Sequence, residues 1–570
     1  MTPPRPAPSW TKTIDTDADA QSMQPVDTRL TEALESLNRV YRALVALTFN
    51  CAPTSGHPGG SLSVGPLVEA LLYGGMAYNL GKPEDRRADQ IVYAAGHKAL
   101  GLYVDWALRD ELARLMAPEL LPAETKQRLR LEDLLGFRRN PARAGKLQQQ
   151  LGSKFLDGHP TPATPFVPVA TGASGVGLAS AVGLALGTAD LFPEDPPRIH
   201  VIEGEGGLTP GRVSEAMAAA TTAGLSNLVL HVDFNQASID SNRVCREGEE
   251  GGDYVPWNPA DLARLQGFNV IEVPEGLSTP RILAAQASLR GQENGRPTAI
   301  IYRTTKGWRY GIEGRASHGA GHACCSEDFY SCLGALDEAM GQKMPRLCSE
   351  PEPEALDEHF WELLQTVRSH LSNNTERFAP LAEGLRRSRD QLEKSARRPR
   401  SDAPHYQGLF EADADNPPEA LRLEAGRSMS LKEALGEGLA ELNRLSQGAI
   451  LLSSADLAGS TSIAMGNEGF APGFFHASHN PKSRLFASGG ICEDAMGGIL
   501  SGLSSYGAHL GAGSSYGAFI AALQHVSARL HAIGQQAASE TRGEARRPWI
   551  MVCGHAGLKT GEDGPTHADP

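Results

Sequence analysis

The spacing of apolar residues predicts that the folded part of the chain begins near residue 27. The preceding residues are polar and rich in proline, and we interpret residues 1–26 as a disordered tail. Asp27 stands where the N-cap of a helix is expected. Beyond it, apolar side chains recur every three or four residues, the period of a buried helix face: Leu30, Leu34, Leu37, Val40, Leu44 and Leu47.

Short β-branched runs alternate with alanine-rich stretches as far as residue 325. Strands this apolar, separated by helices, are typical of a parallel sheet with both faces covered. We therefore predict an α/β domain over residues 27–325. Its strands are expected at residues 199–202, 228–232, 269–273 and 298–302.

The remainder of the chain divides into a charged section and a second α/β pattern. Residues 326–425 are charged, contain proline and include two predicted helices, so we interpret them as an interdomain linker. Residues 426–570 show only three strands, so we expect an incomplete second domain with a parallel sheet. The predicted elements there are a helix at 431–445, strands at 449–453, 484–487 and 549–553, and a helical region at 496–533.

Composition and charge exclude several classes of protein. Hydrophobic residues make up 41% of the 570 residues and charged residues 21%, as in ordinary soluble globular proteins. The net charge of −14 argues against nucleic acid or an anionic membrane surface as the partner. We find no apolar stretch of about 18 residues and no export signal, so we expect no membrane span. The eight cysteines lack CxxC pairs, and we predict a cytoplasmic protein.

Glycine-rich turns indicate where an anionic ligand would bind. Residues 171–177 (TGASGVG) open a helix of small residues, which either packs closely or offers its N-terminal N–H groups to a phosphate. The GEG segment at 204–206 and Asn235 each follow a predicted strand. The carboxyl ends of parallel strands lie at one edge of a sheet, where a carboxylate and an amide oxygen suit a hard cation that bridges to a diphosphate. Either segment alone would be read as an ordinary capping turn.

Five of the 17 histidines occupy glycine-flanked or loop-like positions. A lone histidine is usually structural, but five in this setting suggest imidazoles held on turns around a polar cleft. Such groups suit proton transfer or the binding of hydroxyls and phosphates. The five are His57, His97, His159, His318 and His567.

A carboxylate and a pair of aromatic residues stand out in the last part of the chain. Glu493 precedes an apolar helical stretch, where an acidic residue is commonly a helix cap. Tyr516 and Phe519 have i, i+3 spacing, which would place both rings on one face of a helix. The pair would then either pack in the core or hold a flat heterocycle.

Taken in sequence order, these motifs resemble those of the transketolase family of thiamine-diphosphate enzymes. The resemblance covers most of residues 30–325 and 425–570. It implies two thiamine-diphosphate-binding-type α/β domains: a diphosphate-binding (PP) domain over 27–325, and the N-terminal part of a pyrimidine-binding (Pyr) domain over 426–570. The matching segments are SGHPGG, GHK, DGHP, TGASGVG, GEG followed by DFNQASID, SHGA, SSADLAGS, ICEDAM, YGAF and HAGLKTGEDGPTH.

The resemblance implies roles for individual residues toward thiamine diphosphate. Glu493 matches the glutamate that hydrogen-bonds the aminopyrimidine and so promotes removal of the proton from C2 of the thiazolium ring. Phe519 would stack on the pyrimidine, with Tyr516 beside it. The metal, Mg²⁺ or Ca²⁺, would be held by Glu205, Asn235 and Ala237. The other cofactor-binding positions are His97, Gly172, Ala173, Ser174, Gly206, His318 and Asp456.

The resemblance also implies substrate and catalytic positions. Arg427 and Ser460 fall where the family holds the phosphate of a sugar phosphate, and Asp563 falls where an acid contacts a sugar hydroxyl. The substrate-side histidines are His57, His159, His555 and His567. The residues implied to act in catalysis are Glu493, His57, His318, His555 and His567.

The chain departs from the family pattern at several positions. Glu205 replaces an aspartate, and Mg²⁺ tolerates the longer side chain less well than Ca²⁺ because it demands near-ideal octahedral geometry. Pro210 replaces a glutamate of a network between cofactor sites, and Ala522 replaces an aromatic residue. Because family members continue well past GEDGPTH, we expect a second polypeptide that completes the Pyr domain and supplies a C-terminal domain. With homodimerisation, the assembly would be a heterotetramer.

The resemblance implies an enzyme that transfers a two-carbon ketol unit between sugar phosphates or related ketose and aldose compounds, as the large subunit of a split enzyme. The histidines, Arg427 and Ser460 favour this ketol donor. One alternative uses the same cofactor on a 2-oxo acid and transfers an acyl group. Another is a non-catalytic subunit, which Glu205 and Pro210 would favour and the presence of Glu493 opposes.

Overall fold

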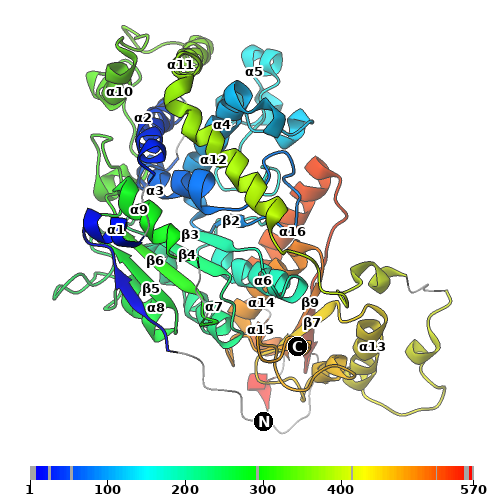
Figure 1. The fold of residues 1–570 in the computed structure, drawn as a ribbon. Coiled ribbons are helices and arrows are strands. Elements are labelled where there is room, and N and C mark those ends of the chain that lie inside the picture. Colours follow the sequence, from blue (N-terminus) through cyan, green and yellow to red (C-terminus); the bar gives the residue numbers. More distant parts are fainter. Residues whose placement is uncertain are drawn as a thin grey trace.

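The computed structural model describes residues 8–23, 27–51, 56–290, 294–411, 415–520, 523–556 and 564–567. Within them the chain forms two parallel sheets, each covered by helices (Figure 1). We call residues 8–394 the first lobe and residues 431–556 the second lobe. The predicted α/β fold with parallel sheets is therefore confirmed. None of the described helices is long and apolar enough to cross a membrane.

The first lobe is built around a six-stranded sheet in which every pairing is parallel. The four strands predicted from β-branched runs all form, and two of them, at 199–204 and 228–234, are buried along their whole length. Across the sheet, the strands are β1 (Thr11–Thr13), β5 (Asn269–Val273), β6 (Thr298–Arg303), β4 (Leu228–Phe234), β3 (Ile199–Gly204) and β2 (Gln90–Tyr93).

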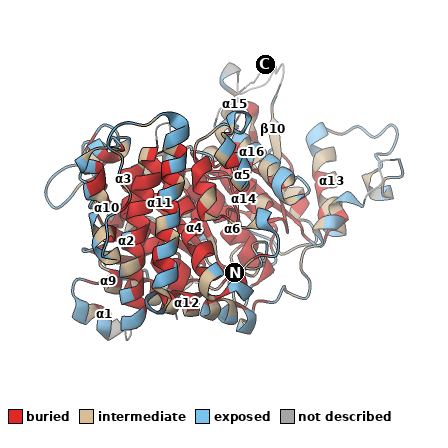
Figure 2. Ribbon diagram, turned by 90° about the horizontal axis from the view of Figure 1, so that it is seen from above, coloured by how far each residue is buried: buried red, intermediate tan, exposed pale blue. Residues whose placement is uncertain are grey.

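Helices cover both faces of this sheet because alternate strand residues point to opposite sides. Ile202 and Ile300 belong to the core that contains α2 and α4, whereas Val201 and Ile301 belong to the core that contains α6 and α7. Figure 2 shows α2, α4 and α6 as largely buried. The helices are α2 (Thr28–Cys51), α3 (Pro58–Ala70), α4 (Ala99–Met116), α5 (Lys146–Leu151), α6 (Val176–Leu191), α7 (Gly211–Thr222), α8 (Pro259–Leu265) and α9 (Thr279–Ala287).

The predicted start of the folded chain is right for α2 but wrong for the tail. The Asp27 side chain accepts hydrogen bonds from the main-chain N–H groups of Arg29 and Leu30, as expected of an N-cap. Upstream of it, however, β1 pairs with β5 and forms one edge of the sheet, and α1 (Asp17–Met23) follows. Strand β1 is three residues long, exposed and polar, so its sequence lacks the apolar pattern that predicts a strand. Main-chain pairing holds it at the edge of the sheet.

The predicted interdomain linker is also wrong for much of its length. Residues 327–394 form α10 (Glu327–Met340), α11 (Pro353–Asn373) and α12 (Thr375–Lys394). Their apolar faces, including Phe360 and Phe378, are buried in the same core as α2. The charged residues that suggested a linker occupy the opposite, exposed faces of amphipathic helices.

The second lobe contains a four-stranded parallel sheet in the order β10, β9, β7, β8. Three of these strands were predicted, but β9 replaces part of the helical region expected at 496–533. Its sequence, LGAGSSY, is made of small residues because α14 lies against it, and a Cβ on Gly511 would stand 2.7 Å from the main-chain oxygen of Leu500. The elements are α13 (Leu431–Leu445), β7 (Ile450–Ser454), β8 (Leu485–Phe486), α14 (Glu493–Tyr506), β9 (Leu510–Tyr516), α15 (Gly517–Ile520), α16 (His525–Arg542) and β10 (Ile550–Gly554).

The two lobes are held together by α6 and α14, which lie side by side (Figure 1). A Cβ on Gly183 would stand 1.9 Å from the main-chain oxygen of Ile499, so only glycine permits this approach. At the end of α6, the buried Asp190 accepts hydrogen bonds from Arg484 at 2.8 Å and His509 at 2.8 Å, both from the second lobe. The interface thus combines close helix packing with a buried charge network.

Candidate active site

Three of the predicted histidines meet at the carboxyl edge of the first sheet. His57 caps α3, His97 follows β2, and His318 ends a short turn that follows β6. The ring centroids of His57 and His318 are 4.5 Å apart, and those of His57 and His97 are 5.5 Å apart. His57 Nδ1 lies 3.0 Å from the main-chain oxygen of His318. We call these residues, with His159, the histidine cluster.

The imidazoles of the histidine cluster are neutral at physiological pH. Burial lowers the pKa of His97 well below its usual value and also lowers that of His57 and His159. For His318, burial and the nearby Lys306 lower the pKa to about 4. A neutral imidazole can both donate and accept a hydrogen bond, which suits contact with a hydroxyl or phosphate oxygen.

Lys306 is a site residue that the sequence reasoning missed. Its Nζ lies 3.0 Å from His318 Nδ1 and 3.0 Å from the main-chain oxygen of Ala237. Burial lowers the pKa of Lys306 to about 8. Because an ammonium group only donates, His318 Nδ1 must accept, which leaves its Nε2–H to donate into the cleft. The available signal was a lysine beside Gly307, which has φ +76°, just after a strand.

The glycine-rich turn at 171–175 packs against the histidine cluster. Gly172 has φ +145°, and a Cβ there would stand 3.4 Å from His159 Cδ2. Gly175, with φ +84°, caps α6 as predicted. Ala173 is half-buried and Ser174 is exposed, so this helix N-terminus is accessible to an anion.

The three predicted metal ligands are linked to one another. The main-chain N–H of Asn235 donates to Glu205 Oε2 at 3.1 Å, and the main-chain N–H of Ala237 donates to Asn235 Oδ1 at 3.0 Å. Beneath them, Lys98 Nζ lies 2.7 Å from Asp233 Oδ2. Burial and the charge of Asp233 raise the pKa of Glu205 to about 7. A cation beside this carboxylate would favour its ionised form.

These residues fit a hard divalent cation. A carboxylate, an amide oxygen and a main-chain carbonyl are oxygen donors of the kind that Mg²⁺ and Ca²⁺ prefer. A Cβ on Gly206 would meet no described atom within 4 Å, so the backbone borders open space there. The described residues contain no group of three or more His, Cys, Asp or Glu side chains arranged for a metal, so a cation would need further ligands from the diphosphate and water.

Glu493 is the first residue of α14, and its side chain is 7% exposed. Ser515 Oγ, on β9, donates a hydrogen bond to Glu493 Oε1 at 3.0 Å. Gln524 Nε2 donates to the main-chain oxygen of Glu493 at 2.8 Å. Both partners were missed from sequence because each depends on where β9 and α16 pack. The buried carboxylate therefore has a fixed orientation.

Aromatic rings gather around the carboxyl end of β9, directly after Ser515. Tyr516 ends β9 and Phe519 lies in α15, so the prediction that both rings share one face of a helix is wrong. They still lie together, with ring centroids 5.9 Å apart. His555 stacks on Tyr516 at 3.8 Å, and His567 meets Phe519 edge-on at 5.0 Å. We call these residues, with Glu493, the glutamate cluster.

The remaining predicted site residues lie in different surroundings. Ser460 Oγ lies 3.2 Å from the Tyr516 hydroxyl, and Asp456 is exposed after β7. Arg427, the other position implied to hold a substrate phosphate, is exposed and forms an ion pair with Glu437. Lys432 Nζ instead donates to the main-chain oxygen of Ser460 at 2.9 Å. Asp563 and Ala522 lie outside the described residues.

The histidine cluster and the glutamate cluster are separate within one chain. Among the described residues, no hydrogen bond or ring contact joins a member of one cluster to a member of the other.

Comparison with known proteins finds two domain types in the chain. Residues 129–328 match the transketolase thiamine diphosphate binding domain, and residues 427–569 match the transketolase pyrimidine binding domain. Transketolase of Halalkalibacterium halodurans is 27% identical over 527 residues, which is 90% of this chain and 67% of that protein. Transketolase-like protein 2 of Bos taurus is 29% identical over 290 residues, 51% of this chain and only 40% of the bovine protein.

Solved structures agree with this fold. Transketolase from Leishmania mexicana superimposes with a TM-score of 0.66 at 23% identity, covering 94% of this chain and 70% of that one. Transketolase from Campylobacter jejuni gives a TM-score of 0.66 at 24% identity, covering 95% and 72%. With both of its characteristic domains found in order on the two lobes, the chain belongs to the transketolase family.

Proposed function

We propose that this chain is a thiamine-diphosphate-dependent transferase that moves a two-carbon ketol unit between sugar phosphates or related ketose and aldose compounds. The observation that carries the proposal is the buried Glu493 carboxylate, which accepts a hydrogen bond from Ser515, the residue before Tyr516. It lies within residues 427–569, which match the transketolase pyrimidine binding domain. The presence of this carboxylate argues against a non-catalytic subunit.

Each cluster has a distinct task in this proposal. When bound, thiamine diphosphate supplies the electron sink for cleaving a carbon–carbon bond beside a carbonyl. Glu493 would hold the proton at the aminopyrimidine nitrogen, while Phe519 and Tyr516 exclude water from the ring faces. On the diphosphate side, the 171–175 turn and His97 would bind oxygen atoms, and Glu205, Asn235 and Ala237 would hold the cation.

The histidines favour a ketose donor over a 2-oxo acid. A sugar presents several hydroxyls that need both donors and acceptors, and neutral imidazoles supply both. His57 and His318 are held 4.5 Å apart between ring centroids and have lowered pKa values, so they remain neutral at pH 7. Loss of carbon dioxide from a 2-oxo acid makes no such demand for hydroxyl recognition.

The separation of the two clusters supports assembly from more than one copy. We propose that the histidine cluster of one copy faces the glutamate cluster of a second copy across a homodimer. Strand β10 lies at the edge of the second sheet and is half-exposed, which leaves main-chain groups available for pairing. We propose that a second polypeptide pairs there, to give a heterotetramer.

The eight cysteines are free thiols, consistent with our proposal of a cytoplasmic location.

Turnover assays test this function directly. With thiamine diphosphate, a divalent cation and ribose 5-phosphate as acceptor, xylulose 5-phosphate should be consumed with a kcat of about 1–1000 s⁻¹. With pyruvate as donor, kcat/KM should be at least about tenfold lower. A preference for pyruvate would support the acyl-transfer alternative and refute ketol transfer. Full activity of the purified chain alone would remove the need for a second polypeptide.

Calorimetric titration with thiamine diphosphate tests the cation site without using activity. Removing Mg²⁺ and Ca²⁺ with a chelator, or replacing Glu205 by glutamine, should weaken cofactor binding at least about tenfold. Ca²⁺ should support binding at least as well as Mg²⁺, since its coordination tolerates the longer glutamate. Asp240→Asn, at an exposed position nearby, is the matched control and should leave binding unchanged. Equal affinity with and without metal would contradict the assigned ligands.

A further inference from the structure

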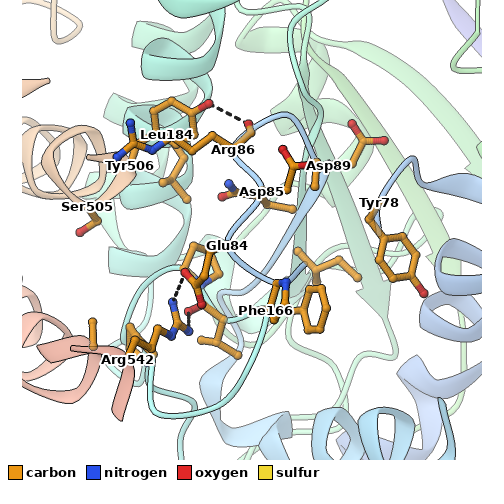
Figure 3. Close-up of a pocket in the computed structure, with 18 of the residues that line it drawn as sticks. Tyr78, Glu84, Asp85, Arg86, Asp89, Phe166, Leu184, Ser505, Tyr506 and Arg542 are labelled. Carbon is orange, nitrogen blue, oxygen red and sulfur yellow. Dashed lines mark hydrogen bonds and ion pairs between the residues drawn. The ribbon is translucent and has the colours of Figure 1, made fainter. Parts of the chain in front are cut away.

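A cavity of about 270 Å³ lies between the two lobes (Figure 3). From the first lobe it is lined by β2, α4 and the segments around residues 83–91 and 162–168, and from the second by the end of α14 and by α16. The described residues that line it include no member of the histidine cluster or the glutamate cluster. It is therefore a second site, independent of the proposed function.

The deep wall of the cavity places a cation among aromatic rings. Arg109, on α4, lines the cavity and is only 3% exposed to solvent. Its guanidinium carbon lies 4.3 Å from the ring centroid of Phe166, 4.5 Å from that of Trp106 and 5.4 Å from that of Tyr78. Figure 3 shows Tyr78 and Phe166 on one side of the cavity and Leu184 and Tyr506 on the other. The lining therefore combines apolar and aromatic side chains with charged ones, which include Glu84, Asp85, Arg86 and Arg542.

The charge of Arg109 is not balanced locally. No described carboxylate forms a salt bridge with it, and its buried Nε has no hydrogen-bond partner among the described residues. Asp105, one turn earlier on α4, forms no salt bridge with Arg109 among the described residues, and burial and Glu69 raise its pKa against the opposing effect of Arg109. A buried cation without an anionic partner is costly, so an anion in the cavity would be strongly favoured.

The other arginines around the cavity already have partners. Arg542 pairs with Glu84 at 3.4 Å and Arg547 pairs with Glu544 at 3.0 Å. Arg86 donates to the main-chain oxygen of Gly507 at 3.0 Å. Among the described arginines that line the cavity, Arg109 is the one with a buried nitrogen that lacks a hydrogen-bond partner. Because Glu84, Asp85, Asp89 and Glu544 also line the cavity, a single negative charge is favoured over a doubly charged phosphate.

We propose that this cavity binds a small aromatic carboxylate, with the carboxylate on the guanidinium of Arg109 and the ring against the aromatic walls. A planar carboxylate matches the planar donor array of a guanidinium. The space is adequate, because an apolar cavity of about 150 Å³ holds benzene, and this cavity is larger. Such a ligand would contact both lobes and stabilise their arrangement.

Titration of the full chain with 3-phenylpropionate tests this assignment, with 3-phenyl-1-propanol as the uncharged analogue of the same shape. The acid should bind about ten- to a hundredfold more tightly than the alcohol, because only the acid makes a charge-assisted hydrogen bond. Arg109→Met should remove that preference. Equal binding of acid and alcohol, no binding of the acid, or tighter binding of inorganic phosphate would overturn the proposal.

A second variant keeps the test decisive if Arg109→Met does not fold. Ala538, on α16, lines the cavity from the opposite lobe, and Ala538→Phe would fill the space while retaining Arg109. This variant should lose binding of 3-phenylpropionate and keep its binding of thiamine diphosphate. Retained binding of the acid by Ala538→Phe would contradict the location. Because thiamine diphosphate binding is measured in parallel, failure here is distinguishable from failure of the proposed function.

Discussion

Replacing Glu493 by glutamine is expected to lower kcat for ketol transfer by about a hundred- to ten-thousandfold, the usual range for loss of a positioned proton-transfer group. Glutamine has nearly the same shape, and its amide oxygen can still accept the hydrogen bond from Ser515. The fold and the affinity for thiamine diphosphate should therefore change little. Steady-state kinetics gives the loss of kcat, and calorimetry gives the cofactor affinity.

The neighbouring carboxylate provides a matched control. Asp494 also lies in the first turn of α14, but it forms an ion pair with Arg212 at 3.0 Å and points toward α7. Asp494→Asn should leave kcat within about twofold of the unmodified chain, because this carboxylate is held by Arg212 and has no assigned role toward the cofactor. If Glu493→Gln kept a tenth or more of the activity, the assigned role of this carboxylate would be wrong.

Mixing two inactive variants extends the same experiment to the proposed homodimer. One variant carries Glu493→Gln and the other carries His97→Ala, so the two substitutions lie in different clusters. In a symmetric dimer with sites between copies, half of the mixed dimers' sites are intact, and random exchange restores up to about a quarter of the normal activity. If both clusters of a site came from one copy, mixing would restore nothing.

Much of the histidine cluster was predictable because its residues stand next to glycine or proline, which mark turns and helix starts. Pro58 begins α3 directly after His57, and Gly96 precedes His97 at the end of β2. Strands β3 to β6 were predictable because buried parallel strands have continuous apolar sequences. The carboxyl ends of such strands lie at one edge, so residues following them were expected to converge. The structure brings them together there.

Other features depend on tertiary packing and leave little local trace. The small residues of strand β9 predict a helix from sequence. They are small because α14 packs closely against the strand. Helices α10 to α12 resemble a linker in sequence because charged residues cover their exposed faces. Lys306 and Ser515 are single residues whose roles depend on which neighbouring loop or strand they meet. The role of Arg427 stays a prediction, since its exposed side chain pairs with Glu437.

Asp190 is the residue whose loss is expected to destabilise the chain most. It is fully buried at the end of α6 and accepts hydrogen bonds from Arg484 and His509 of the second lobe, with Arg400 at 3.3 Å. Arg484 is itself only 1% exposed. Asp190→Asn would leave that guanidinium buried without a countercharge, which costs about 3–5 kcal/mol. Urea unfolding at pH 7 measures the loss.

The surface pair of Asp402 and Lys482 is the control for this prediction, since both side chains are more than half exposed. Asp402→Asn should change the free energy of unfolding by less than about 1 kcal/mol. Exchanging both Asp190 and Arg484 for apolar residues, as Asp190→Leu with Arg484→Met, should cost less than Asp190→Asn alone, because no unpaired charge remains. A smaller loss for Asp190→Asn than for Asp402→Asn would show that the network does not hold the lobes together.

The same network predicts how stability depends on pH. Arg484 and the hydrogen bond from His509 lower the pKa of Asp190, against the opposing effect of burial. A carboxyl group whose pKa is lowered by folding stabilises the protein above its unfolded pKa of about 3.9 and loses that contribution as the pH falls below it. His509 does not reverse this trend, because burial lowers its pKa and keeps it a neutral donor to Asp190. The cost of Asp190→Asn should therefore be constant between about pH 5 and 8 and should shrink only below about pH 4. A cost that instead declined between pH 6 and 8 would place the stabilising titration on a histidine, and the assignment to Asp190 would fail.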